Sequence, residues 1–544
     1  MTGVAFPRDA KGKRTTTRAG KEVWAAAALA LESLEGRALA QDILLEKDWR
    51  HRYPKHLTAL AELQSTVERA MCVASARGGL AALHDHFEFV VEEGEDDETS
   101  RPLADAMREA VTDGRTYLRT ARIGRVAVSR SPPPAASEAL LASARAWAAD
   151  GAIERDVVDA LERANAHATE WASERGLFKD VVFVLLGGTS ELCPLIPLLE
   201  RGATVACVAR GEAGIKSAAA IATASECGGT LLFPIKPKPW EADLRFDESK
   251  AASWREAWDE GRAGADLIAD APALAAWLYA LEPKKRLVIG SYAYLDGEAH
   301  VRASLASDAV AAAVLDKRPD TALAYLTSPG TAFPIPKSAW DDSKARHERE
   351  NWTWWHQPLW LFTGGFKPNC RPPAKREKKL RVIDEDAEVD DASAEMHEDV
   401  HVHDGHLVLQ GPNYALAKTL QNWRAIVARD DGHCVSANVA PASRTKSMLH
   451  VDAVKRGLEG QKHFAPLRAF DVEETRDMMC ALLLHDLGHE GSSARPEWGR
   501  REDGDGRHPF DAFGATAAHG GTWRCAFSVD SIGKAAYVLG STIG

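Results

Sequence analysis

Two residues in one short stretch have side chains and a spacing that suit proton transfer. Tyr414 and Lys418 lie four positions apart near the start of a predicted helix that runs to about residue 429. Side chains at this spacing share one face of a helix. An ammonium group beside a phenol favours the phenolate, so the hydroxyl can give or take a proton near neutral pH. Tyr414 is therefore a candidate general acid or base, and Lys418 is the group expected to lower its pKa.

The segments around this pair have the pattern of an α/β protein. Continuous apolar segments predict buried strands, and segments of helical periodicity separate them. The predicted strands comprise residues 181–186, 204–209, 230–235 and 286–291, a segment that ends near 327, and residues 433–439. This alternation predicts a parallel, doubly wound sheet, which is a Rossmann-like arrangement.

A glycine turn follows the first of these strands. Its residues precede an apolar helix and are Gly187, Gly188, Thr189 and Ser190. In a βαβ unit, a turn of this kind lies at the carboxyl end of the strand, where a helix N-terminus can hold a pyrophosphate. The sequence therefore predicts a nucleotide site upstream of the Tyr414 helix.

The Tyr-x-x-x-Lys helix, the strand and Pro-x-x-x-Thr turn that follow it, and the upstream βαβ unit resemble the short-chain dehydrogenase/reductase family. The resemblance implies an NAD(P)(H)-dependent oxidoreductase that interconverts a carbonyl and an alcohol, or reduces a related double bond, on a small-molecule substrate. It implies that Tyr414 is the general acid or base and that Lys418 also contacts the nicotinamide ribose. Ser328, at the end of the fifth strand, would orient the substrate oxygen.

The resemblance also implies where a cofactor would bind. Gly187 to Ser190 would face the pyrophosphate, and Arg210 would contact the adenosine phosphate, so NADP(H) is expected rather than NAD(H). The glycine fingerprint of the family has Glu191 and Cys193 in place of two glycines, and the predicted helix at 299–317 has no asparagine to assist the serine. These departures keep a second hypothesis open, a Rossmann-type scaffold that has lost catalysis.

The chain divides into three regions by composition. We expect a disordered basic tail at 1–21, a helical extension at 22–175, and a reductase-like domain at 176–544. Within the helical extension, an acidic run at 90–102 and a Ser/Pro stretch at 129–137 predict loops. The domain carries two insertions, at 334–410 and 488–520, and residues 524–529 are predicted to form its last strand.

The first insertion holds two unusual groups of side chains. Its tryptophans either pack in a subdomain of their own or form a lid over an apolar substrate; they are Trp352, Trp354, Trp355 and Trp360. His401, His403 and His406 form the densest imidazole cluster, and alternate residues of a strand face one side, so a metal shared by His401 and His403 is a further alternative. We expect solvated loop residues here and assign no metal.

A third hypothesis concerns residues 482–490, LLLHDLGHE, which resemble the His-Asp signature of metal-dependent phosphohydrolases of the HD superfamily. In that interpretation His485 and Asp486 would bind a divalent ion together with His450 and a later aspartate. The alternative is a helix-terminal pair without a metal.

Charge and composition exclude several classes of protein. The formal charge of -12 and the pI of about 5.9 argue against a nucleic-acid-binding surface. No apolar run approaches the roughly 20 residues that a membrane span needs. The 8 cysteines include no Cys-x-x-Cys pair, so a reducing compartment, the cytoplasm, is expected. The basic N-terminus leaves an organelle transit peptide as an alternative. Members of the family commonly pair through the tyrosine helix and a late amphipathic helix, here 470–487, so a homodimer is a further expectation.

Overall fold

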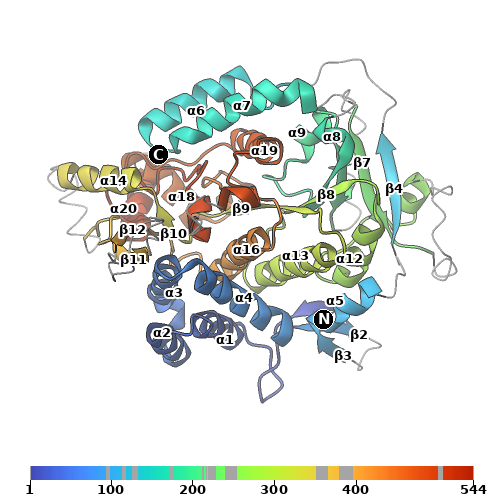
Figure 1. The fold of residues 1–544 in the computed structure, drawn as a ribbon, viewed down its shortest axis with the longest axis horizontal. Helices are drawn as coiled ribbons and strands as arrows, with labels where there is room; N and C mark the ends of the chain where they lie inside the picture. The colour runs from blue at the N-terminus through green and yellow to red at the C-terminus, as the bar shows by residue number, and fades with distance from the viewer. Residues whose placement is uncertain are drawn as a thin grey trace, which may run out of the picture.

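The computed structural model describes residues 2–92, 98–112, 118–124, 133–171, 176–210, 214–215, 217–218, 228–238, 254–350, 365–378, 396–499 and 507–542. Its centre is a seven-stranded sheet in the order β13-β9-β8-β5-β6-β7-β4 (Figure 1). The strands are β4 (Arg119–Gly124), β5 (Val181–Leu186), β6 (Thr204–Val208), β7 (Thr230–Ile235), β8 (Arg286–Ser291), β9 (Ala322–Thr327) and β13 (Val435–Val439). All neighbours pair in parallel except β4, which is antiparallel to β7. The predicted α/β class is confirmed, and the order of the parallel strands is compatible with a Rossmann-like fold.

The sheet is buried on both faces, which explains why its strands are apolar throughout. Alternate residues of β5 belong to two different cores. Val182, Val184 and Leu186 pack in the core on one face, and Val181, Phe183 and Leu185 pack in the core on the other. The first face is covered by α12 (Ala271–Ala280), α13 (Glu298–Lys317) and α16 (Pro412–Asp430), and the second by α7 (Arg155–Trp171), α9 (Leu195–Glu200) and α19 (Val472–Gly488) (Figure 1).

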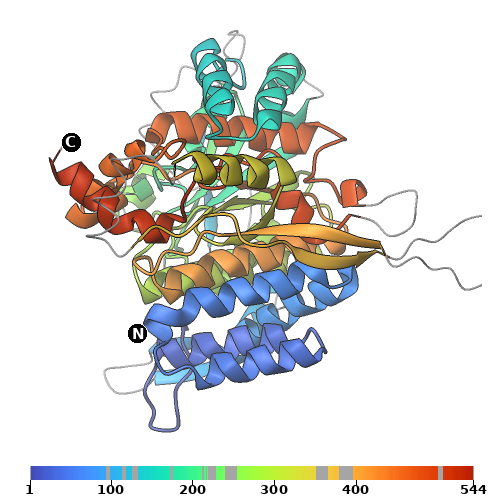
Figure 2. The ribbon, with the colours of Figure 1, turned by 90° about the vertical axis from the view of Figure 1, so that its left-hand side faces the viewer.

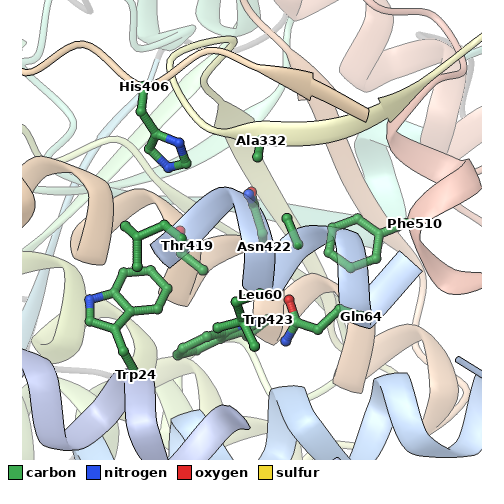
Figure 3. Close-up of a pocket in the computed structure, with 11 residues that line it drawn as sticks. Trp24, Leu60, Gln64, Ala332, His406, Thr419, Asn422, Trp423 and Phe510 are labelled. Atoms are coloured by element: carbon green, nitrogen blue, oxygen red, sulfur yellow. The ribbon is translucent and has the colours of Figure 1, made fainter. Parts of the chain in front are cut away.

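The N-terminal region forms an additional helical layer over α16 and α13 (Figure 2). Its elements are β1 (Gly3–Ala5), α1 (Thr16–Leu29), α2 (Leu34–Leu45), α3 (Trp49–Thr66), α4 (Arg69–His86), β2 (Glu88–Glu92), β3 (Glu98–Pro102) and α5 (Leu103–Thr112). The buried rings of Trp24 on α1 and Trp423 on α16 meet edge to face at 5.2 Å. A small cavity between these layers is lined by both rings, Gln64 and Asn422 (Figure 3). Both indole nitrogens and the Asn422 Oδ1 are buried without a partner, which suits an internal water.

Three predictions of local structure are wrong. Residues 1–21 do not form a disordered tail, because β1 pairs with β2 and α1 begins at Thr16. The segment predicted as an acidic loop contributes β2 and β3, which pair antiparallel on either side of residues 93–97. Residues 524–529 form no strand; only Phe527 makes an isolated bridge, and α20 (Val529–Thr542) follows. The first two predictions rested on charge and the third on a local apolar pattern, whereas tertiary packing decides the conformation of all three segments.

The first insertion builds a second sheet. Its described part contains β10 (Ala332–Ile335), α14 (Lys337–Glu350), β11 (Ala374–Lys378) and β12 (Met396–Asp404), with the antiparallel order β10-β12-β11. The four tryptophans of the proposed lid lie outside the described residues. The second insertion is irregular where described, with the short 3-10 turns η3 (Pro496–Gly499) and η4 (Pro509–Phe513). The remaining helices are α6 (Glu138–Asp150), α8 (Leu177–Asp180), α11 (Trp254–Asp259), α17 (Lys446–Leu449), α18 (Asp452–Gly460) and η2 (Gln461–His463).

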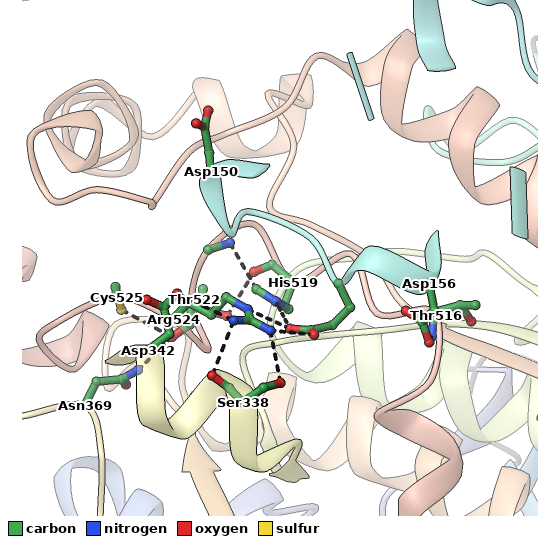
Figure 4. Close-up of polar contacts among 12 residues, drawn as sticks. Asp150, Asp156, Ser338, Asp342, Asn369, Thr516, His519, Thr522, Arg524 and Cys525 are labelled. Carbon is green, nitrogen blue, oxygen red and sulfur yellow. Dashed lines mark hydrogen bonds and ion pairs between the residues drawn. The ribbon is translucent and has the colours of Figure 1, made fainter. Parts of the chain in front are cut away.

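A buried ion network fixes the connection between α6 and α7 to the C-terminal loop (Figure 4). The Glu154 carboxylate accepts hydrogen bonds from His519 Nε2 (3.0 Å) and from Arg524 Nε and Nη2 (3.0 and 2.8 Å). Burial raises the pKa of Glu154, but the hydrogen bonds from His519 and Arg524 outweigh it and lower the pKa to about 2. The carboxylate therefore stays ionised and ties together segments that are distant in the sequence.

The expected route of dimerisation is closed on both helices. The outer face of α16 packs against α1 and α4 of the same chain, and α19 packs against α7. The predicted amphipathic helix at 470–487 is present as α19, but its residues from Met478 to Leu487 are all buried. A homodimer thus remains a prediction that needs other surfaces. Among the described residues, no helix has the length and apolarity of a bilayer span.

Candidate active site

The structure brings Tyr414 and Ser328 together at the carboxyl end of the parallel strands. Ser328 directly follows β9, and Tyr414 lies in the first turn of α16. The helix can begin here because Gly411 has a positive φ of 86° and Pro412 occupies the first helical position. Tyr414 Oη and Ser328 Oγ are hydrogen-bonded at 2.8 Å, and the Gly330 N–H donates to the same serine oxygen at 3.1 Å. In open α/β sheets this end of the strands is where ligands bind.

Lys418 lies one turn along α16 and is anchored to two strands. Its Nζ donates to the Leu326 carbonyl on β9 at 3.2 Å and to Gln421 Oε1 at 3.3 Å. Gln421 Nε2 in turn donates to Ser291 Oγ at the end of β8, at 3.4 Å. The sequence drew no attention to Gln421, although it stands three residues after Lys418 and thus on the same helix face.

The pKa values differ from the expectation that Lys418 lowers that of Tyr414. Burial raises the pKa of Tyr414 to about 12, and the hydrogen bond with Ser328 only partly offsets this. Burial also lowers the pKa of Lys418 to about 8. The loss of hydration on burial is thus the largest cause of both shifts. In this state Tyr414 is a protonated phenol near neutral pH, which suits an acid rather than a base.

His300 is a polar neighbour of this site that the sequence did not reveal. It lies in the first turns of α13 and is 1% exposed. Its ring lies 5.8 Å from that of Tyr414 and 4.8 Å from that of Tyr294. Burial, with a smaller contribution from Lys418, lowers the pKa of His300 to about 3, so the imidazole is neutral. It lies on the helix that has no asparagine to assist Ser328, as do Ser304 and Ser307. Ser304 Oγ has no partner, and Ser307 Oγ donates to the Ala303 carbonyl.

The glycine turn is present, but its amides are used within the fold. Gly187 has a φ of 83°, and a Cβ there would lie 2.5 Å from the Ala293 backbone. The N–H groups of Gly187 and Gly188 both donate to the Val208 carbonyl at 3.0 Å, and that of Ser190 donates to the Gly187 carbonyl. Thr189 is exposed, and α9 begins only at Leu195. The turn is therefore shaped by its contacts with β6 and the loop after β8.

Two charged residues lie beyond the carboxyl ends of the parallel strands. Arg210, after β6, has a side chain that is 63% exposed, and its nearest carboxylate is that of Asp266 at 3.9 Å. Glu191 reaches from the loop after β5 to the segment after β13, where its carboxylate accepts the Lys446 N–H at 2.7 Å. Arg210 is thus accessible to an anion. Glu191 connects the loop after β5 to the segment after β13.

A scan against protein-family models found no match, and neither did searches of curated proteins and of solved structures. Functional inference therefore depends on the geometry of the site.

The two metal alternatives lack a ligand set in the structure. Asp486 is 2% exposed and accepts hydrogen bonds from Ser436, Asn438 and Ser492 at 2.6–2.7 Å, whereas His450 is exposed. His401 and His403 lie on β12 with both ring nitrogens buried and without a partner, and His406 pairs with Asp404 at 3.0 Å. Within the described ranges, no group of three His, Cys, Asp or Glu side chains is arranged to hold a metal ion.

Proposed function

We propose that the protein is an oxidoreductase of the short-chain dehydrogenase/reductase type, which uses NADP(H) to interconvert a carbonyl and an alcohol. The observation that carries the proposal is the 2.8 Å hydrogen bond between Tyr414 and Ser328, whose positions are 86 residues apart. Lys418 lies on the same helix within a turn of Tyr414. A phenol, a hydroxyl and an amine at the carboxyl end of a parallel sheet form a proton-transfer site that a structural role does not require.

The residues fit a dinucleotide in part. The Gly187 turn allows close approach of the chain above β5, and Arg210 is exposed where an adenosine phosphate would need a cation. Glu191 opposes an anion beside the turn, so its contact with Lys446 has to open for the cofactor to enter. When bound, the nicotinamide would exchange a hydride with the substrate carbon. Gly187, Gly188, Thr189, Ser190 and Arg210 would line its phosphate-binding side.

The chain's own groups would carry the proton. In the reductive direction, the Tyr414 hydroxyl gives its proton to the substrate oxygen, and the phenolate that remains is favoured by the Lys418 ammonium. Ser328, already hydrogen-bonded to Tyr414, donates to the same substrate oxygen and holds it beside the phenol. The phenolate then recovers a proton from water. The raised pKa of Tyr414 keeps its hydroxyl protonated before the reaction.

The test separates binding from proton transfer. We expect NADPH to bind more tightly than NADH in a fluorescence titration, and reduction of carbonyl compounds to be lost by about 10²–10⁴-fold in Tyr414→Phe. Tyr537→Phe is the matched control, because Tyr537 is exposed on α20. Both variants should bind NADPH like the wild type. Failure to bind either cofactor at about millimolar concentration would contradict the proposal.

The contact between Glu191 and Lys446 favours a second candidate, a Rossmann-type scaffold without catalysis. It fastens the glycine loop to the segment after β13, across the carboxyl ends of the intervening strands. If the chain is such a scaffold, neither the wild type nor Glu191→Ala should bind NADPH. Under the oxidoreductase proposal, the same substitution should strengthen NADPH binding, because it removes a carboxylate from beside the glycine turn.

A further inference from the structure

A basic pocket lies at the end of α16 opposite to Tyr414. It is walled by the start of α4, the end of α16 and the segments around η3 and η4. The charged and titratable side chains of its wall are Arg69, Arg429, Asp430, Arg495, Arg507 and His508. Fifteen residues of helix separate Tyr414 from Arg429, which is about 22 Å. This pocket is therefore separate from the candidate active site.

Several nitrogen atoms in the pocket wall are buried and lack an acceptor. Arg429 donates through Nη2 to the Val435 carbonyl at 2.9 Å, but its Nε and Nη1 have no partner. Arg495 Nε is also without one. His508 is 6% exposed, and its Nε2 is unpaired while Nδ1 accepts the Phe510 N–H at 3.3 Å. A buried donor without an acceptor is unfavourable, so these nitrogen atoms lack acceptors that a bound ligand could supply.

The charges of the wall are unequal. Among the described residues that line it, Asp430 is the single carboxylate, and it is already paired with Arg69 at 2.9 Å and with Arg77 at 3.4 Å. The charge of Asp486 also acts on Arg429, but both carboxylate oxygens of Asp486 already accept other hydrogen bonds. Arg507 is exposed and lies 4.2 Å from the centroid of Trp498. The remaining positive charge is concentrated at this pocket, although the formal net charge of the whole chain is -12.

A structural role explains only part of this arrangement. Arg429 lies in the last turn of α16, where a cation favours the helix dipole, and its guanidinium lies 5.4 Å from the Phe513 centroid. Neither fact accounts for Arg495, Arg507 and His508 beside it. Burial lowers the pKa of His508 to about 3, with Arg376 and Arg69 contributing, so this imidazole is neutral and faces a positive field.

We infer that this pocket binds a phosphate group, either inorganic phosphate or the phosphate of a small metabolite. Guanidinium groups hold phosphate by paired hydrogen bonds, and a tetrahedral anion offers acceptors in several directions at once. Arg429, Arg495 and Arg507 supply the charge, and His508 supplies a neutral nitrogen at the wall. The ligand would link α4, the carboxyl end of α16 and the segment after α19.

Calorimetry on the full chain at low ionic strength tests the inference. Inorganic phosphate should bind with a Kd below about 1 mM. We expect Arg507→Gln to weaken binding by about 3–10-fold and Arg429→Gln by at least about 10-fold. The matched control is Arg145→Gln on α6, whose side chain is 54% exposed and paired with Glu162. The Nε and Nη1 atoms of the half-buried Arg429 are themselves buried, so its variant is expected to lose stability, whereas the exposed side chain of Arg507 packs on the Trp498 ring and its variant keeps the test valid.

Two further ligands define the class. A phosphate monoester that binds more tightly than inorganic phosphate would assign the site to a metabolite, and the reverse order would assign it to phosphate itself. Malonate of equal charge should bind more weakly than either. Absence of phosphate binding at about 10 mM, equal affinity in the wild type and Arg507→Gln, or equal affinity for malonate would overturn the inference.

Discussion

The imidazole of His300 and the phenol of Tyr414 lie face to face, with 5.8 Å between ring centroids and 25° between their planes. Both imidazole nitrogens are buried and have no hydrogen-bond partner. Two buried polar atoms without a partner are costly for stability. Such a cost is typical of residues retained for function rather than for folding. We interpret His300 as a positioning residue, which holds a water or a substrate group beside Tyr414.

Replacing His300 by Phe separates the effect of this residue on stability from its effect on the reaction. Phe retains a ring against Tyr414 and removes both nitrogens, so we expect the free energy of unfolding to rise by about 1 kcal/mol. Carbonyl reduction should fall by about 10-fold, with NADPH binding unchanged. Urea denaturation and steady-state kinetics measure the two quantities. A variant that is more stable and equally active would show that His300 has no part in the reaction.

The low pKa of Lys418 predicts a pH dependence of the reductive reaction. Burial lowers this pKa to about 8, so the ammonium is charged below that pH and neutral above it. The charge favours the phenolate that Tyr414 becomes, and its loss should slow proton transfer. We therefore expect kcat/KM for carbonyl reduction to be constant near pH 6–7 and to fall above about pH 8. Lys418→Met should be slow and lack this step. A wild-type profile that stays level to about pH 10 would exclude Lys418 from this role.

The sequence was most informative where one pattern determined one element. Five-residue and six-residue apolar runs became the parallel strands, because only strands covered on both faces can be apolar throughout. The spacing of Tyr414 and Lys418 and the position of Ser328 after the fifth strand led to residues that the structure places near one another. Local periodicity is sufficient for such features.

Features that arise from long-range packing were not predictable from the sequence. His300 and Gln421 gain their positions from the crossing of α13, α16 and the strand ends, which no local pattern encodes. The direction of the pKa shift of Tyr414 depends on burial, which its neighbours in sequence do not reveal. The first residues looked like a tail, yet Val4 is fully buried and its carbonyl accepts a hydrogen bond from Arg302 at 2.6 Å.

The packing of α4 on α16 predicts an unequal response to two similar substitutions. A Cβ at Gly79 would lie 2.3 Å from the Trp423 ring, which is fully buried and cannot retreat. Gly79→Ala should therefore destabilise the protein by about 1–3 kcal/mol. At Gly457, also within a helix, nothing lies within 4 Å of the added atom. Gly457→Ala should stabilise the protein by about 0.5–1 kcal/mol, because alanine is the better helix former. Equal effects in urea denaturation would contradict the close contact between α4 and α16.

The buried Glu154 carboxylate should make stability depend on pH in the acid range. Its pKa in the folded protein is lowered to about 2 from an ordinary value of 4.5. A depressed carboxyl pKa contributes stability that is complete above the unfolded pKa and is lost as the pH falls through the folded one. Glu154→Gln removes the charge that His519 and Arg524 share, and should cost about 3 kcal/mol at pH 7. The difference from the wild type should shrink between about pH 4.5 and 2, where the wild-type carboxyl is itself neutralised.

Glu162→Gln is the control for this last experiment, because Glu162 forms an exposed pair with Arg145 and its side chain is 47% exposed. An exposed pair contributes about 0–1 kcal/mol, so this variant should unfold close to the wild type at every pH. The measurement is urea denaturation at several pH values. A cost for Glu154→Gln that stays constant from neutral to acid pH would mean that shape, and not the ionised carboxylate, connects α6 and α7 to the C-terminal loop.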